Sequence, residues 1–207
     1  MRAIPPAALA LLLAAGCAHA TGPDLACPPG TVLRENSRDA RCETPNGVAE
    51  GPTFGRYGNG RLRYYGTSRN GKTEGPWTSW NQDGTVSIEA NYEGGELVGW
   101  FRRFDAHGVL QSEGQHDRRG RMDGVWTSYW PNGRVRTRWT MAHGEQDGPV
   151  ATWYESGARK SEGQRARGRS DGDWTWFAED GSVAARCRYD QGRVVEGDCS
   201  VPTARRE

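Results

Sequence analysis

Apolar and polar residues alternate strictly along several short segments of this chain. Between positions 85 and 92 the apolar members are Val86, Ile88, Ala90 and Tyr92, with polar residues between them. Segments 134–141 and 182–189 repeat the alternation. A period of two is typical of a β-strand with one buried face. The pattern predicts an all-β fold.

Glycine divides these segments into regular units. Seven anchor glycines recur at steps of 24 or 25 residues: Gly51, Gly75, Gly99, Gly124, Gly148, Gly172 and Gly197. A second glycine follows each of the first six anchors by nine positions, and a third follows by twenty. Gly120 comes one place late because the third unit carries an inserted residue. Such a period predicts an array whose units stack on their neighbours.

Each unit predicts one β-hairpin. Asp83-Gly84 and Asn132-Gly133 stand between alternating segments, which is the signal for a two-residue turn with positive φ at both residues. About six stacked units of ~24 residues therefore predict about twelve strands in one elongated antiparallel sheet. In the fifth unit, polar residues and Gly163 occupy the inward positions of segment 159–165. We expect that strand to be the least well packed.

Composition and charge limit the class of protein. Only 35% of the 207 residues are hydrophobic and 29 are glycine, which is too polar for a large globular core. Nine tryptophans are nevertheless too many for a disordered chain. The formal net charge is +1, so we expect no electrostatic capture of nucleic acid.

The N-terminal residues have the pattern of an export leader. Arg2 precedes an apolar run over positions 3–15, shorter than the ~18 residues of a membrane-spanning helix. The sequence Ala-Ala-Gly-Cys at 14–17 resembles a bacterial lipobox and predicts a lipoprotein-type signal peptide over 1–17, with lipidation of Cys17. Ala-His-Ala at 18–20 favours instead an ordinary signal peptide over 1–20.

The remaining cysteines suggest disulfides. If Cys17 carries lipid, four are left, an even number in an exported chain. Local pairing joins Cys27 to Cys42 and Cys187 to Cys199, while the two other pairings and free thiols stay open. We expect a stapled cap at 21–48, the repeat array at 49–200 and a tail at 201–207.

Aromatic residues stand two and five positions after most anchors. These positions face opposite sides of a regular strand, so either a bulge follows the anchor or Trp80, Phe104 and Phe177 cover the second face. If these three are exposed, they mark an interaction surface or stack on sugars or quaternary ammonium groups. The alternative is an apolar stripe that holds the sheet together.

Arginine supplies nearly all of the basic residues and gathers at outward positions of the second strands. Candidates for binding are Arg134, Arg136 and Arg138 in the fourth unit, because arginine suits bidentate contact with phosphate or carboxylate. The alternative is a solvated face balanced by neighbouring Asp and Glu.

Metal binding and catalysis find little support. Six of the seven anchors follow an acidic residue, with Val98 as the exception. Such a carboxylate row is a candidate for Ca²⁺, but it lacks the dense spacing of a calcium loop. We therefore expect the acids to solubilise turns and pair with arginine, and we expect no metal site. No catalytic motif occurs, so we expect neither an enzyme nor a cofactor.

Two units carry a family resemblance. Segments 75–84 (GPWTSWNQDG) and 124–133 (GVWTSYWPNG) resemble the variant MORN repeat found in bacterial proteins labelled YwqK-type antitoxins. The resemblance covers about residues 51–197. It implies antiparallel hairpins in an elongated sheet and roles in protein or membrane-lipid contact.

These observations predict a non-catalytic lipoprotein of the cell envelope that binds an unidentified protein or envelope component. Its lipid would anchor it to a membrane, the bacterial outer membrane first; without lipid it would be periplasmic or secreted. One alternative is an antitoxin-like protein that neutralises a partner toxin by direct binding. A weaker alternative is an aromatic-cage module for cell-wall ligands.

Overall fold

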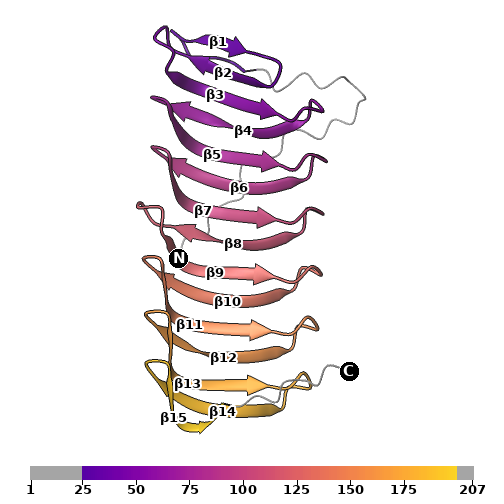
Figure 1. Ribbon diagram of the computed structural model, residues 1–207, viewed down its shortest axis with the longest axis vertical. Coiled ribbons are helices and arrows are strands. Elements are labelled where there is room, and N and C mark those ends of the chain that lie inside the picture. The colour runs from indigo at the N-terminus through magenta and orange to yellow at the C-terminus, as the bar shows by residue number, and fades with distance from the viewer. Residues whose placement is uncertain (1–24, 200–207) are drawn as a thin grey trace, which may run out of the picture.

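The computed structural model describes residues 25–199, which form fifteen strands in one open antiparallel sheet (Figure 1). The strands follow chain order across the sheet, so each pairs with its neighbours in sequence. The predicted all-β array of hairpins is confirmed. Over the described range, no helix has the length and hydropathy needed to cross a membrane.

In chain order the strands are β1 (Val32–Glu35), β2 (Asp39–Glu43), β3 (Ala49–Arg56), β4 (Leu62–Arg69), β5 (Lys72–Trp80), β6 (Val86–Glu93), β7 (Glu96–Phe104), β8 (Leu110–His116), β9 (Met122–Tyr129), β10 (Val135–Ala142), β11 (Glu145–Trp153), β12 (Arg159–Ala166), β13 (Arg169–Phe177), β14 (Val183–Asp190) and β15 (Arg193–Asp198). Strands β3 to β14 are the six hairpins that the glycine period predicts. The other three strands, β1, β2 and β15, extend the same sheet at its two ends.

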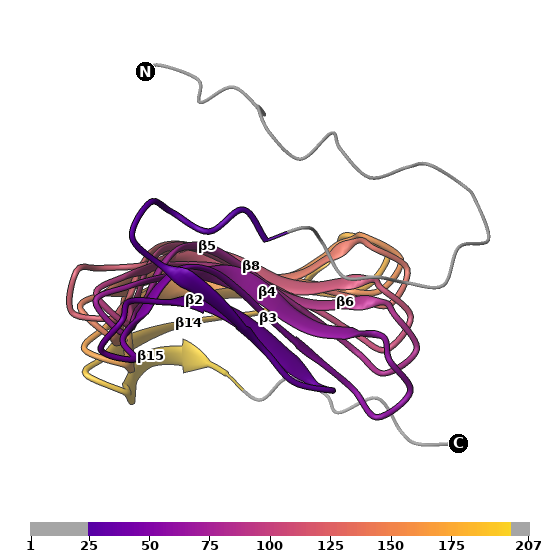
Figure 2. The same ribbon diagram turned by 90° about the horizontal axis from the view of Figure 1, so that it is seen from above.

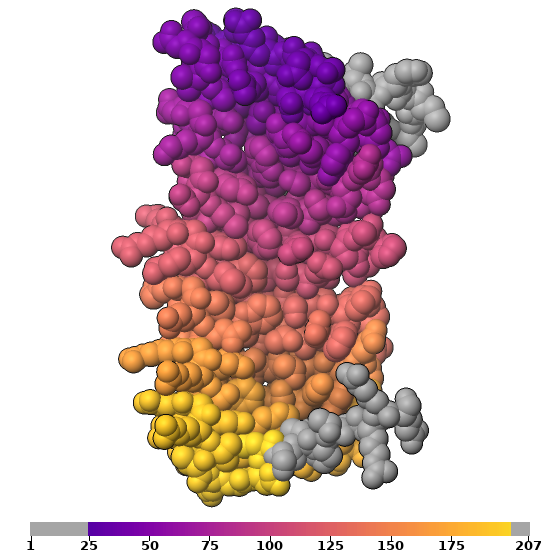
Figure 3. Space-filling view, in the orientation of Figure 1, coloured from indigo at the N-terminus to yellow at the C-terminus, as the bar shows by residue number. Residues whose placement is uncertain are grey.

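The sheet is a single twisted layer. Seen along the stacking direction, the strands superpose and rotate gradually from β2 to β15 (Figure 2). In the space-filling view the units follow one another as bands of one elongated slab (Figure 3). Because no second layer within residues 25–199 packs on the slab, few apolar side chains are buried, among them Phe54, Trp126 and Trp174.

One side, here called the indole face, carries Trp77, Trp126 and Trp174, the residues two positions after their anchors. Their rings pack against aromatic neighbours on adjacent strands: Trp77 stacks on Tyr64 at 4.9 Å, and Trp126 lies 6.4 Å from Trp139. These contacts run from strand to strand, which is how a one-layer sheet removes apolar surface from water.

Glycine makes room for these indoles. A register shift places residues 75–77 opposite the single residue Gly66 of the preceding strand, and a Cβ at Gly66 would overlap the Trp77 ring. Gly114 and Gly163 leave the same space for Trp126 and Trp174. A bulge therefore lies at the anchor, and Trp77 and Trp80 still lie on opposite faces, so the two arrangements considered from the sequence occur together.

The expectation that the fifth-unit strand packs worst is wrong. On β12, Ser161 is buried and its hydroxyl lies 2.6 Å from that of Thr152. Gly163 accommodates Trp174, and the guanidinium of Arg165 lies over the same ring. The residues of β1 and β15 are all exposed, so the two edge strands are the least covered.

The predicted turn type is also wrong at the second glycine. There only the glycine has positive φ, as at Gly60 (85°), and the hydrogen bonds Tyr57 N–H to Arg61 O and Gly60 N–H to Tyr57 O enclose a three-residue loop. The Asn59 carboxamide oxygen instead accepts the Arg61 N–H, a local bond that favours this loop. The two-residue turn with positive φ at both positions occurs at the third glycine, for example Asn70-Gly71.

Disulfides join Cys27 to Cys42 and Cys187 to Cys199, the pairing expected from the sequence. At the N-terminal end, Pro28 packs against Gly51, and Cys42 and Phe54 are buried. At the C-terminal end the disulfide ties β15 to β14, although β15 stays exposed. Predicted features at Cys17, at the leader and in the tail 201–207 lie outside the described residues.

Candidate binding surface

The anchor glycines are structural. All seven have positive φ, from 67° at Gly172 to 118° at Gly148, and six of them lie where the strand register shifts. Glycine adopts this conformation without the steric cost that a Cβ would add. They set the fold and offer no side chain for binding.

The acidic residues before the anchors hold the third-glycine turns. Glu50 accepts the Asn70 N–H at 2.7 Å, and Glu74 accepts the Gly94 N–H at 2.8 Å. Asp123 and Asp171 make the same contact with the N–H of the residue twenty positions on. The carboxylate row is thus used by backbone donors, and residues 25–199 contain no cluster of His, Cys, Asp and Glu suited to a metal ion.

The exception at Val98 coincides with the inserted residue. In that unit the turn is a three-residue loop closed between Asp117 and Arg121. Asp117 itself accepts the N–H groups of Arg119 and Arg121, and it forms two bonds with the Arg121 guanidinium. These bonds hold the pKa of the Asp117 carboxyl far below its usual range. An acidic side chain at position 98 would therefore have no two-residue turn whose N–H it could accept.

The residues five positions after the anchors belong to the opposite side, here called the charged face. Tyr129 donates to Glu113 at 2.6 Å, and the Trp153 ring lies under Arg138. Trp80, Phe104 and Phe177 hold the same repeat position and are half-buried. The aromatic residue most exposed on this sheet is Trp100, at 41%, which the sequence analysis did not single out.

The three candidate arginines differ in what they contact. The guanidinium of Arg134 donates to the carbonyl oxygens of Glu155 and Ser156 in the next unit, so it links two turns. Arg136 lies 4.8 Å from the centre of the Trp130 ring, and Arg138 lies 5.8 Å from that of Trp153. Both are exposed, and neither has an ion-pair partner among the described residues.

The third unit neutralises its Arg102. Arg102 lies directly opposite Glu89 on β6 and Glu113 on β8, with ion pairs of 3.8 and 3.3 Å. Burial, and then the bond to Glu113, raise the pKa of Tyr129 to about 12. This part of the charged face therefore presents a closed network of polar contacts.

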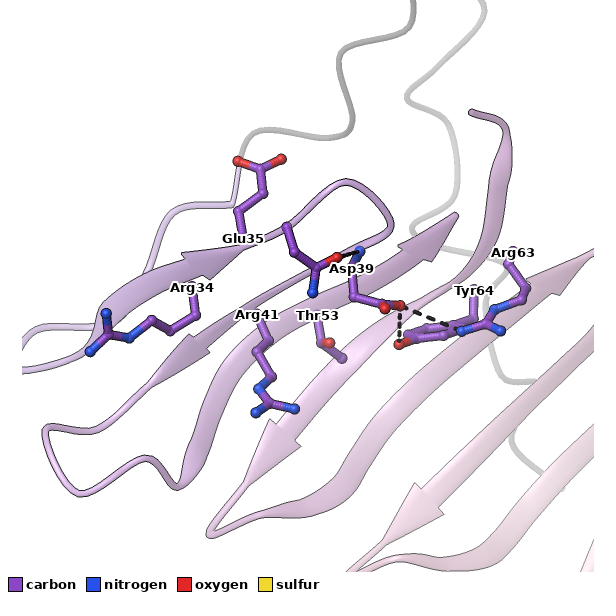
Figure 4. A pocket seen from close by; sticks show the side chains of 8 residues that line it. Arg34, Glu35, Asp39, Arg41, Thr53, Arg63 and Tyr64 are labelled. Atoms are coloured by element: carbon purple, nitrogen blue, oxygen red, sulfur yellow. Dashed lines mark hydrogen bonds and ion pairs between the residues drawn. The ribbon is translucent and has the colours of Figure 1, made fainter. Parts of the chain in front are cut away.

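A shallow hollow of about 350 Å³ lies at the N-terminal end, among β1 to β4. Figure 4 shows Arg63 and Tyr64 reaching toward Asp39, which accepts from both at 3.4 and 3.2 Å. Burial and the Asp39 carboxylate raise the pKa of Tyr64. Glu43 pairs with both Arg34 and Arg41, so the charges of the hollow are balanced within the protein.

A one-layer sheet of hairpin units with two open faces defines the class: a β-repeat protein whose surfaces, not an enclosed cleft, are available for contact. Residues 122–142, which span β9 and β10, match the family model described as MORN repeat variant. The same hairpin recurs in the other five units.

Two solved structures are similar at a low level. One is a crystal structure of an S. aureus TarM mutant in complex with Fondaparinux, alpha-GlcNAc-glycerol and UDP, and the other is a crystal structure of TarM. Each shares 8% identity with a TM-score of 0.28, over 57% of this chain and 21% of the TarM chain. That likeness is too low to inform fold or function. Among curated proteins, none matches.

Proposed function

We propose that this protein is a non-catalytic binding module of the cell envelope that holds a protein or envelope component against its sheet. The observation that carries the proposal is the single layer: residues 25–199 form a fifteen-stranded sheet, and none of them builds a second layer on either face. Such a sheet has a small core for its surface, which is the architecture of proteins that work through extended contact surfaces.

The disulfides support an envelope location. Cys27–Cys42 and Cys187–Cys199 lie at the two ends of the array, and structural disulfides belong to oxidising compartments. A cytoplasmic antitoxin would meet reducing conditions. A leader ending at Cys17, with lipid on that residue, completes the proposal by tethering the array to a membrane.

The repeat class supports a contact role. Repeats of the kind matched at 122–142 are generally associated with protein or membrane binding. The contact surface we propose is the charged face, where half-buried aromatic rings and exposed arginines occur together.

Photo-crosslinking in the native host tests this function. A benzophenone amino acid replaces Trp80, Phe104 or Phe177 on the charged face, and Arg103 on the indole face in a matched variant. The proposal predicts one discrete crosslinked partner from the charged-face positions and none from position 103. Absence of any discrete product from all four positions contradicts a binding function.

Intact-mass analysis of the N-terminal peptide tests the location. Diacylglyceryl-modified Cys17 is the expected result. An unprocessed Met1 contradicts the envelope location.

A further inference from the structure

We infer that the charged face of the fourth and fifth units is a binding site for an extended acidic polypeptide segment. The site, here called the cation patch, consists of Arg136, Arg138 and Lys160 with the rings of Trp130, Trp153 and Tyr154. The inference rests on the proposed binding function and names the chemistry of its partner.

In the cation patch each cation lies against an aromatic ring. Lys160 holds the repeat position of Arg136 one unit later, and its Nζ lies 5.3 Å from the centre of the Tyr154 ring. With Arg136 over Trp130 and Arg138 near Trp153, three cations stand over three half-buried rings. Contact with a ring orders a long side chain before a ligand arrives and leaves its donors pointing outward, which lowers the entropy cost of binding.

The charge of the patch is not balanced within the protein. Two acids lie two strands away from Arg138, and both are engaged elsewhere. Glu162 pairs with Arg159 at 2.9 Å, and Glu113 pairs with Arg102 and accepts from Tyr129. Arg138 lies opposite Thr127 and Ala151, which carry no charge. Arg136, Arg138 and Lys160 are exposed and have no carboxylate partner within residues 25–199. Three free cations on one surface call for an anionic partner.

Spacing favours an extended acidic chain. Arg136 and Arg138 are two residues apart on β10, with a bulge at Arg136; in a regular strand such residues stand about 7 Å apart. Acidic residues at alternate positions of an extended polypeptide have the same spacing, and arginine clusters are a recurring means of recognising acidic motifs. Trp, Tyr and Arg are also the residues that dominate the energetics of protein interfaces.

The same surface fits a membrane less well. Insertion into a bilayer needs exposed apolar side chains, but no member of the patch is among the exposed large hydrophobic residues of the described chain. Each of its rings has a cation over it.

The test uses the full mature chain and a fluorescein-labelled peptide that alternates Glu and Ser, followed by fluorescence anisotropy. We expect binding by the wild type that weakens as salt is raised. The triple variant Arg136→Gln, Arg138→Gln, Lys160→Gln should bind about tenfold or more weakly. The matched control Arg103→Gln, Arg118→Gln, Arg119→Gln removes the same charge elsewhere and should bind within about twofold of wild type. Circular dichroism confirms that each variant is folded.

Three results overturn the inference. Equal binding by wild type and patch variant places the peptide elsewhere. Binding of anionic phosphatidylglycerol vesicles or polyphosphate but not the peptide, with loss in the patch variant, assigns the patch to another anion. No binding of any probe overturns it as well. In each case the discrete crosslinks from Trp80, Phe104 and Phe177 still decide whether the proposed binding function stands.

Discussion

The two halves of this sheet are built from the same repeat, and they differ in the residues that lie opposite a central arginine of the charged face. In the N-terminal half, Arg102 lies between Glu89 and Glu113 and is neutralised from both sides. In the C-terminal half, Arg138 lies between Thr127 and Ala151 and remains free. The difference lies in the residues opposite the arginine, since the backbone arrangement is shared.

The two ends differ in the same sense. At the N-terminal end, Cys42 and Phe54 are buried beside the Cys27 disulfide. At the C-terminal end, β15 is exposed along its length. Coverage and charge pairing therefore vary locally along one repeat backbone, and the exposed cations of β10 and β12 that lack a carboxylate partner are the ones suited to a binding partner.

The largest expected effect comes from removing the disulfide at either end of the sheet, and the two ends should respond differently. Closing loops of 15 and 12 residues stabilises each end by about 3 kcal/mol. Cys27→Ala with Cys42→Ala should lower the free energy of unfolding by this amount, because the unfolded chain regains the conformational freedom that the closed loop removes. Cys187→Ala with Cys199→Ala should chiefly fray β15. Amide hydrogen exchange distinguishes them: protection lost only in 193–198 is expected for the second pair, and loss throughout the sheet contradicts it.

The next largest effect is expected where β8 packs against β9, between the two halves of the sheet. Gly114→Ala places a Cβ in the space of the Trp126 ring and should cost about 1–3 kcal/mol in urea denaturation. Trp126→Phe in the same chain should recover part of the loss, because the third unit already pairs Ala90 with Phe101 at the equivalent positions. A double variant no more stable than Gly114→Ala would contradict this packing account.

A smaller effect is expected when the acidic neighbours of Arg102 are reproduced around Arg138. Thr127→Glu with Ala151→Glu places carboxylates opposite Arg138, as Glu89 and Glu113 lie opposite Arg102. Binding of the acidic peptide should weaken about tenfold, or about 1.4 kcal/mol, while the free energy of unfolding falls, because Thr127 is buried and a carboxylate at that position must lose its water. Anisotropy and urea denaturation measure the two quantities. Unchanged binding would show that Arg138 is not part of the site.

The smallest effect concerns Tyr129 at the boundary. Its pKa of about 12 in the folded protein exceeds that of the unfolded chain, near 10. Its contribution to stability is therefore complete below pH 10 and lost as the pH rises through 12. The pKa of Tyr64 is raised as well, so absorbance at 295 nm should show late titration of which Tyr129→Phe removes one component. Glu113→Gln should shift this titration to lower pH, and an unshifted titration would contradict the role of Glu113.

The sequence was sufficient to predict the hairpins, because glycine at fixed steps marks both the bulges and the turns. It misled on the turn at Asn59-Gly60, where the side chain of Asn59 bonds to the backbone two residues on and selects a longer loop. It also misled on Gly163, whose missing side chain is the space that Trp174 fills from the next strand. The first error comes from a local bond between a side chain and the backbone, and the second comes from a contact that a single unit does not contain.

The sequence identified the arginines of the fourth unit as candidate binding residues, but it did not show which of them are free or which rings lie beside them. Arg134, Arg136 and Arg138 are alike in sequence, yet only Arg134 reaches the carbonyls of the next turn. Trp130 and Lys160 each contact a patch member six residues away in the chain, and Trp153 contacts Arg138 from the next strand. The grouping of these pairs on one surface follows from the pairing of β10 with β11 and of β11 with β12.

The most direct test of the account follows the nine tryptophan indole signals by two-dimensional NMR while the acidic peptide is added. The account predicts shifts of Trp130 and Trp153, which lie under the free cations, with Trp77 and Trp126 on the indole face unchanged. Shifts confined to Trp77 and Trp126, with Trp130 and Trp153 unmoved, would place the contact on the other face and contradict it.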